Sequence, residues 1–175
     1  MFSRILLPVD GSEHACKAAA LAGDLATRYA AGVVVLHVLD PSDVGPEEQH
    51  MAEVEHIVEP GHEYAWLQDV PAELNKMLEP ADSRTQREQV LGFLAREVVG
   101  HTMDRLREHG VDPGHVRVLF KNGNAAKRIL ETVDEQEVDL VVMGSRGLSD
   151  VGALVQGSVS HRVAHAAPCT VATVK

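Results

Sequence analysis

Short apolar runs alternate with amphipathic helical segments along this chain, and that alternation is the strongest constraint on its fold. The runs consist mainly of Val, Leu and Ile and fall at 4–9, 33–39, 115–120, 138–143 and 169–174. Between them, apolar residues recur every three to four positions, as in helices with one buried face, at 13–29, 84–109, 124–136 and 158–166. Apolar strands separated by helices predict a parallel sheet that is covered on both faces.

The expected fold is therefore a single doubly wound α/β domain over 1–175, with five parallel strands and right-handed crossovers. A chain of 175 residues is about the size of one domain. Hydrophobic residues make up 45% of it and aromatic residues only 3%, so the core must consist of aliphatic side chains. In the long helix at 84–109, the side chains expected to face this core are Leu91, Leu94, Val98 and Leu106.

One segment, at about 41–83, departs from this pattern and is interpreted as an acidic, Pro-rich insert. It contains five of the eight prolines and the only Trp, with possible short helices near 47–58 and 71–79. Between Asp40 and Asp82 there are 12 acidic residues and one basic residue, which leaves 14 acidic and 15 basic residues elsewhere. The net charge of −10 therefore belongs almost wholly to the insert, and it argues against a nucleic-acid partner.

The location of the protein is predicted from what the sequence lacks. No apolar run reaches the roughly 18 residues of a membrane-spanning helix, and the first residues do not resemble a signal peptide. Cys16 and Cys169 show no CxxC spacing and are interpreted as small buried residues, with a regulatory disulfide as the alternative. A cytoplasmic protein without membrane insertion is expected.

A glycine pattern after the fourth strand is the motif that most clearly indicates chemistry. It reads G-x2-G-x9-G-S, with Gly144, Gly147 and Gly157-Ser158 at its fixed positions. Gly144 and Gly147 are expected to adopt positive φ and to let the backbone approach a ligand. Gly157-Ser158 opens a helix, whose first N–H groups form a seat for phosphate, and the hydroxyls of Ser158 and Ser160 would add donors. The alternative is a surface turn followed by a helix cap.

The loops after the first and fourth strands would flank one crevice if those strands are neighbours, since ligands of open α/β sheets bind where the strand order reverses. Asp10 is then either a cap of the first helix or a ligand of the bound group. Arg146 either offsets anionic charge or is a solvated loop residue.

These residues resemble the universal stress protein family, in particular its ATP-binding subclass, which carries the same glycine spacing. The strand ending Pro8-Val9-Asp10-Gly11-Ser12 and the segment Pro168-Cys169-Thr170-Val171 are also similar to the family, over roughly 2–40 and 84–175. The resemblance implies strand order 3-2-1-4-5, a homodimer formed through the last strand, and ATP bound with a divalent ion such as Mg²⁺. The insert is longer and more acidic than the family's usual connection.

The resemblance also implies a role for each matching residue. The adenine pocket would be lined by Pro8, Val9 and Val38. Asp10 would lie near the ribose or the metal and phosphates. The ribose and first phosphates would be contacted by Met143, Gly144, Arg146 and Gly147. The outer phosphates would be held by Gly157, Ser158, Val159 and Ser160.

Several histidines and aromatic residues have competing interpretations. His37 is expected to be a packing residue within its strand. His161 and His165 have the i, i+4 spacing of metal ligands without an evident third ligand, and His50, Glu53 and His56 form a weaker candidate. No metal site is therefore predicted from side chains alone. Tyr64 and Trp66 are expected to anchor the insert to the body or to a partner subunit rather than to bind a base.

Enzymatic motifs are largely missing, because the chain has no P-loop, no GxGxxG fingerprint and no GxSxG elbow. The expected function is an ATP-binding regulatory module of the stress response, which signals through a dimer to an unidentified protein partner. Two alternatives remain: a dimeric stress module that binds no nucleotide, and a slow ATP hydrolase that uses the same crevice.

Overall fold

The computed structural model describes residues 1–39, 86–147 and 157–175, and for 86–93 it describes the backbone only. Five parallel strands form one sheet: β1 (Arg4–Val9), β2 (Gly32–Leu39), β3 (Val116–Asn122), β4 (Leu140–Gly144) and β5 (Thr170–Val174). Their order across the sheet is β3-β2-β1-β4-β5, which confirms the predicted strand order.

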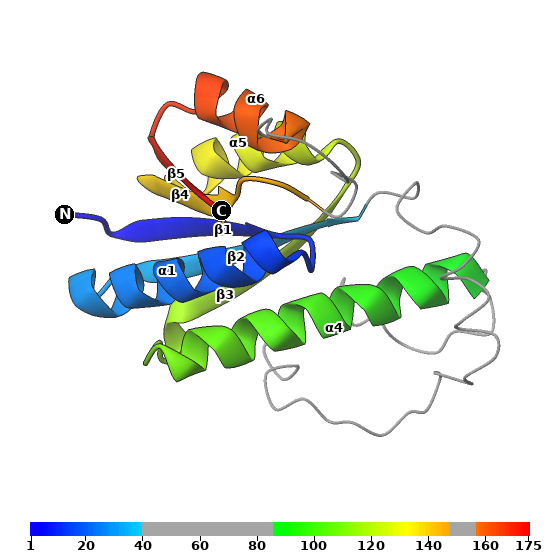
Figure 1. The fold of residues 1–175 in the computed structure, drawn as a ribbon, viewed down its shortest axis with the longest axis horizontal. Coiled ribbons are helices and arrows are strands. Elements are labelled where there is room, and N and C mark those ends of the chain that lie inside the picture. The colour runs from blue at the N-terminus through cyan, green and yellow to red at the C-terminus, as the bar shows by residue number, and fades with distance from the viewer. Residues whose placement is uncertain (40–85, 148–156) are drawn as a thin grey trace.

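The described helices cover both faces of the sheet (Figure 1). On one face lie α1 (Glu13–Tyr29) and α4 (Gln86–Glu108), and on the other lie α5 (Ala125–Glu135) and α6 (Ser158–Ala166). Alternate residues of each strand enter opposite core clusters: Ile5 and Leu7 face α1 and α4, whereas Leu6 faces α5 and α6. The predicted α/β fold is confirmed. None of the described helices is long and apolar enough to span a membrane.

Helix α1 begins where the sequence indicates, because Ser12 caps it. The Ser12 hydroxyl accepts a hydrogen bond from the N–H of Ala15 at 3.2 Å, which satisfies one donor of the first turn. The buried face of α1 consists of small residues, Ala15, Ala18, Ala19, Ala22, Gly23 and Ala26. A face of this kind lets the helix lie close to both the sheet and α4.

The buried face of α4 differs from the prediction at Leu94, whose side chain is 36% exposed, while Leu91 lies outside the residues with described side chains. Leu106 is buried as predicted, and Val98 is half-buried. The fully buried residues of the helix follow the spacing Ala95, Val99, Thr102, Met103 and Leu106. Ala95 takes the inward position, and the neighbouring Leu94 is turned by about 100° away from it.

The start of β4 also differs slightly from the prediction, which placed the strand at 138–143. The Asp139 carboxylate accepts hydrogen bonds from Ser3 N–H at 2.8 Å, Ser3 Oγ at 2.7 Å and Arg4 N–H at 3.2 Å. Asp139 thus ties the start of β1 to the approach to β4, and regular strand geometry begins at Leu140. Burial disfavours the charged form, but these hydrogen bonds outweigh it and hold the pKa of Asp139 below its usual value.

The two cysteines are free, and Cys16 is exposed on α1, so its interpretation as a buried residue is wrong. The outward position follows from the helix register, in which Ala15, Ala18 and Ala19 face the core. Cys169 is half-buried before β5, and burial raises the pKa of its thiol. The predictions for the acidic insert, including its short helices, Tyr64 and Trp66, lie outside the described residues.

Candidate functional site

The strand order reverses between β1 and β4, so the loops that follow these two strands lie together at the carboxyl edge of the sheet. The pairing of β1 with β4 joins Ile5 to Leu140 and Leu6 to Val141. Pro8 lies after these two residue pairs in β1, opposite Leu36 of β2. Because proline lacks an N–H, Pro8 cannot donate a hydrogen bond to a neighbouring strand. The end of β1 therefore lies at the point where a ligand of this fold is expected.

The turn from β1 into α1 is held by its own residues and by α4. One oxygen of the Asp10 carboxylate, Oδ1, accepts a hydrogen bond from Ser12 N–H at 3.0 Å. Gly11 has φ +83°, and a Cβ there would lie 2.9 Å from Cγ2 of Val98 on α4. Helix α4 thus packs directly against this turn, and only glycine fits at position 11.

The second oxygen of the Asp10 carboxylate, Oδ2, lies beside Gly147, because a Cβ at Gly147 would be 2.8 Å from it. Gly144 meets the first turn of α1, where a Cβ would lie 3.0 Å from the backbone atoms Ala15 N and His14 C. The two loops that were predicted to flank one crevice therefore lie against each other. The prediction of positive φ at Gly144 and Gly147 is wrong, because both have ordinary backbone angles and are needed for close approach alone.

The first turn of α6 presents N–H donors that have no partner within the helix toward the same carboxyl edge of the sheet. Gly157 is the N-cap and has no side chain to satisfy them, and the helical ladder begins with His161 N–H bonded to Gly157 O at 3.0 Å. The N–H groups of Ser158, Val159 and Ser160 consequently have no partner within the helix. Together with the helix dipole they create a positive potential that suits an anion.

Ser160 differs from Ser158 in what its side chain can do. Its hydroxyl is buried and lies 2.8 Å from Ser145 O and 3.0 Å from Gly157 O, both of which accept from it. Ser158 is exposed. In this structure, therefore, Ser160 offers an anion its main-chain N–H, and Ser158 offers both its N–H and its hydroxyl.

The apolar residues among the predicted site residues divide between the two faces of the sheet. Val38, Met143 and Val159 join the core cluster on the α5 and α6 face, and Pro8 shares that face by strand alternation. The side chain of Val9 lies on the opposite face, in the cluster with α1 and α4. The side chain of Val9 therefore does not share a face with Pro8 and Val38, and only its main chain could join them in the predicted pocket.

One hydrogen bond between side chains of the two loops was not predicted from the sequence. Nδ1 of His14, in the first turn of α1, lies 2.9 Å from Oγ of Ser145, which is 4% exposed. The Ser12 hydroxyl also lies 3.4 Å from the carbonyl oxygen of Arg146. The only sequence signal was position, since Ser145 and Arg146 stand between the two glycines.

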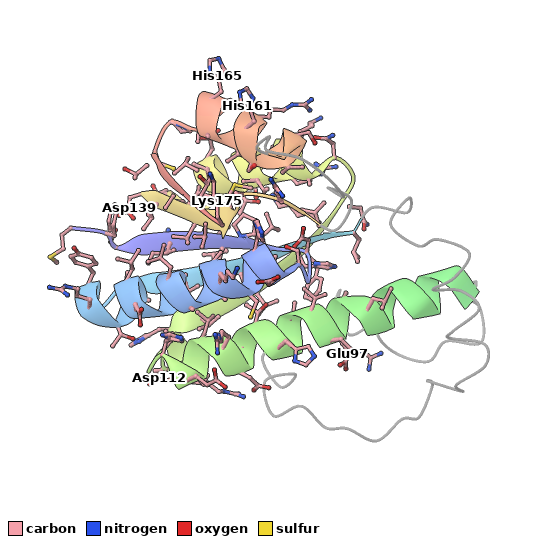
Figure 2. All side chains as sticks on the ribbon, in the orientation of Figure 1. Glu97, Asp112, Asp139, His161, His165 and Lys175 are labelled. Atoms are coloured by element: carbon pink, nitrogen blue, oxygen red, sulfur yellow. The ribbon has the colours of Figure 1, made fainter. Side chains whose placement is uncertain are left out.

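The histidine interpretations are resolved in part. In β2, His37 Nδ1 lies 2.8 Å from Val9 O, and the ring meets Phe120 edge-on at 6.0 Å between centroids, as expected of a packing residue. His161 and His165 project outward from α6, away from the sheet (Figure 2). Among the described residues, no group of three or more His, Cys, Asp or Glu side chains is placed to hold a metal. The candidate at His50, Glu53 and His56 lies outside them.

The fold and the site define a doubly wound α/β domain with a candidate anion seat at its switch point. The family model of the universal stress protein family matches residues 1–175. A universal stress protein of Thermus aquaticus is 31% identical over 175 residues, which cover all of both chains. The chain therefore belongs to the universal stress protein family.

Solved structures of this family share the fold. A universal stress protein described in complex with cAMP superposes with a TM-score of 0.63 at 19% identity, over 99% of this chain and 97% of that one. The universal stress protein of Archaeoglobus fulgidus described in complex with dAMP gives a TM-score of 0.57 at 17% identity, over 100% of this chain and 98% of that one.

Proposed function

We propose that this protein is a cytoplasmic ATP-binding regulatory module of the stress response. The observation that carries the proposal is the convergence of three features at one edge of the sheet. Asp10 lies against Gly147, the N-terminus of α6 lacks a side-chain cap, and Gly157 N–H is bonded to Ser145 O at 2.8 Å. Negative phosphates find unpaired N–H donors there, with a carboxylate nearby.

The position proposed for the nucleotide follows from the chemistry of each part. Pro8 and Val38 would line the adenine pocket on the α5 and α6 face, and Met143 would lie beside the ribose. The ribose and inner phosphates follow the turn at Gly144, Arg146 and Gly147, and the outer phosphates meet the first turn of α6, at Gly157, Ser158, Val159 and Ser160. The family structures described with cAMP and dAMP support an adenine nucleotide as the class of ligand.

A Mg²⁺ ion fits this arrangement through Asp10 and the phosphates. Mg²⁺ prefers oxygen ligands and usually binds through one or two carboxylates together with phosphate oxygens and water. Oδ1 of Asp10 already accepts from Ser12 N–H, which leaves Oδ2, beside Gly147, as the oxygen to bind the ion. The ion would neutralise the part of the phosphate charge that the 144–147 turn does not neutralise by itself.

We further propose that the nucleotide changes the surface which the protein presents to a partner, and that the protein acts as a homodimer formed through β5. A ligand shifts a conformational equilibrium only if it binds the two states differently. The nucleotide would satisfy this condition by binding only the state in which the 144–147 turn and the first turn of α6 lie together. The partner protein would then distinguish the loaded form from the empty form.

Nucleotide analysis tests the proposal directly. Purified protein is denatured and any released nucleotide is identified, and the stripped protein is then titrated with ATP, ADP and AMP in the presence of Mg²⁺. Copurified ATP, or micromolar binding of ATP, is the expected result. If no nucleotide is released and millimolar ATP does not bind, the proposal is refuted. The alternative, a dimeric stress module that binds no nucleotide, would then be correct.

Turnover separates the binding module from the slow hydrolase. Phosphate release is followed with excess ATP for the native chain and for Asp10→Ala, the residue whose carboxylate faces the proposed phosphates. The regulatory module predicts no steady release of phosphate in either. Steady turnover that is lost in Asp10→Ala, with ATP binding retained, would identify the protein as a hydrolase.

A further inference from the structure

Ser145 connects four elements of the fold at the candidate site. Its N–H donates to Val174 O of β5 at 2.7 Å, and its carbonyl accepts from Gly157 N–H at 2.8 Å and from Ser160 Oγ at 2.8 Å. The backbone of Ser145 is thereby committed to β5 and α6. Its hydroxyl is the remaining polar group, and it meets Nδ1 of His14 on α1 at 2.9 Å.

Two hydrogen bonds link the start of α1 to the turn around Ser145. Gly144 and Gly147 flank it, and glycine loses more conformational freedom on ordering than any other residue. From α1, the Ser12 hydroxyl reaches Arg146 O at 3.4 Å, near the outer limit for a hydrogen bond. The shorter contact between His14 and Ser145 is therefore the stronger link from the first turn of α1 to this turn.

We propose that His14 and Ser145 form a positioning pair, which fixes the 144–147 turn and the start of α6 in the geometry that binds the nucleotide. This inference rests on the proposed function. Neither side chain is assigned a contact with the ligand. A turn that is already ordered binds without the cost of ordering it, so the pair raises affinity by preorganisation.

The chemistry of the pair predicts which substitutions preserve it. A neutral imidazole can accept from the Ser145 hydroxyl or donate to it, depending on its tautomer. An Asn side chain also supplies both a donor and an acceptor, at a distance from the backbone close to that of Nδ1. His14→Asn should therefore retain the hydrogen bond, and His14→Ala and Ser145→Ala should each remove it.

A double-mutant cycle on the full chain tests the proposal, with MgATP as the probe in isothermal titration calorimetry. His14→Ala and Ser145→Ala should each weaken ATP binding by about three- to tenfold, the effect of one hydrogen bond. The double variant should bind no more weakly than the weaker single variant, since both substitutions remove the same interaction. His14→Asn should stay within about twofold of the native Kd, as should the control His165→Ala on the outer face of α6.

Urea unfolding of each variant separates positioning from general stability. A loss of stability without a change in the Kd for ATP would overturn the proposal, as would single effects that multiply in the double variant. If Ser145→Ala does not fold, the two variants of the half-buried His14 provide the test. Weaker ATP binding in His14→Ala together with native affinity in His14→Asn supports the pair. Native affinity in both variants refutes it. Failure of the native chain to bind ATP would instead refute the proposed function, before any variant is compared.

Discussion

At the scale of single residues, the missing side chain at Gly147 brings two loops into contact. The Asp10 carboxylate occupies the space that a Cβ would take, at 2.8 Å from its ideal position. The contact sets the distance between the end of β1 and the turn after β4. It also keeps Oδ2 of Asp10 at the edge where the phosphates are proposed to bind.

Gly147→Ala should therefore weaken ATP binding by about tenfold or more while the fold is retained, because the new methyl group displaces the carboxylate. Calorimetric titration with MgATP measures the effect. Gly114→Ala is the matched control, since a Cβ there would meet Asp112 Oδ1 at an ordinary 3.4 Å. Equal affinities in the native chain and Gly147→Ala would show that this contact does not shape the site.

Asp139 gives a prediction about pH. Its pKa is lowered in the folded protein, so its contribution to stability is complete above the ordinary value of 3.8 and is lost as the pH falls through the lower folded value. Asp139→Asn should reduce the free energy of unfolding by about 1 kcal/mol at pH 7, because the hydrogen bonds from Ser3 and Arg4 weaken.

Urea unfolding at pH 7 and at about pH 3 checks this. The difference between the native chain and Asp139→Asn should shrink at the lower pH, and the exposed Asp134→Asn should show little change at either. A difference that stays constant between the two pH values would contradict the assigned role.

The single-residue expectations show where sequence reasoning ends. The spacing of Gly144, Gly147 and Gly157 indicated the site, but positive φ was the wrong reason for two of these glycines. Their true constraint is a neighbour distant in the chain, and a sequence does not show such a neighbour until the strand order is known. The same is true of the contact between His14 and Ser145, whose residues have no local pattern in common.

At the scale of elements, the first turn of α6 provides the N–H donors that are proposed to bind phosphate. The N-cap Gly157 has φ −59° and ψ 151°, which is the extended conformation that a following proline requires. Ser158 is the first helical residue, a position that tolerates proline because its N–H has no partner in the helix. This geometry allows a single N–H to be removed without breaking the helix.

Ser158→Pro should thus retain α6 but weaken ATP binding by about tenfold, through loss of a main-chain donor and of the hydroxyl. Ser158→Ala, which keeps the N–H, should weaken it less. Circular dichroism verifies the helix, and calorimetry with MgATP gives the two affinities. Equal affinities for the two variants would place the phosphates away from this turn.

The helices and strands themselves were largely predictable, because their signals are local. Ser12 and Asn124 cap α1 and α5 by accepting hydrogen bonds from backbone N–H groups, and Gly110 follows α4 with φ +80°. The error at Leu94 arose because its spacing from Leu91 and Val98 suggested an inward side chain. Ala95 is buried instead, and which of two neighbouring residues is buried depends on tertiary packing.

At the scale of the whole molecule, the sheet ends in β5, which pairs with β4 on one side only within the described residues. An edge of this kind can pair with a second copy of the chain. Thr170 and Thr173 are exposed on β5. The proposed homodimer would join two such edges.

Replacing Thr170 and Thr173 together with Lys should convert the dimer to a monomer, since charged edges resist strand pairing. Light scattering after size exclusion measures the mass, and the native chain should give twice its 18.9 kDa. Lys substitutions at the exposed Glu135 and Glu137, away from β5, serve as the control. A native monomer, or a dimer that survives the Thr substitutions, would exclude this interface.

The proposed site holds the nucleotide between the 144–147 turn and the first turn of α6. Amide NMR spectra recorded during a titration with MgATP locate the bound nucleotide. The largest shifts should belong to the N–H groups of Gly147, Ser158, Val159 and Ser160, with small shifts along β3. Binding that shifts a different set of amides and leaves these four unchanged would contradict it.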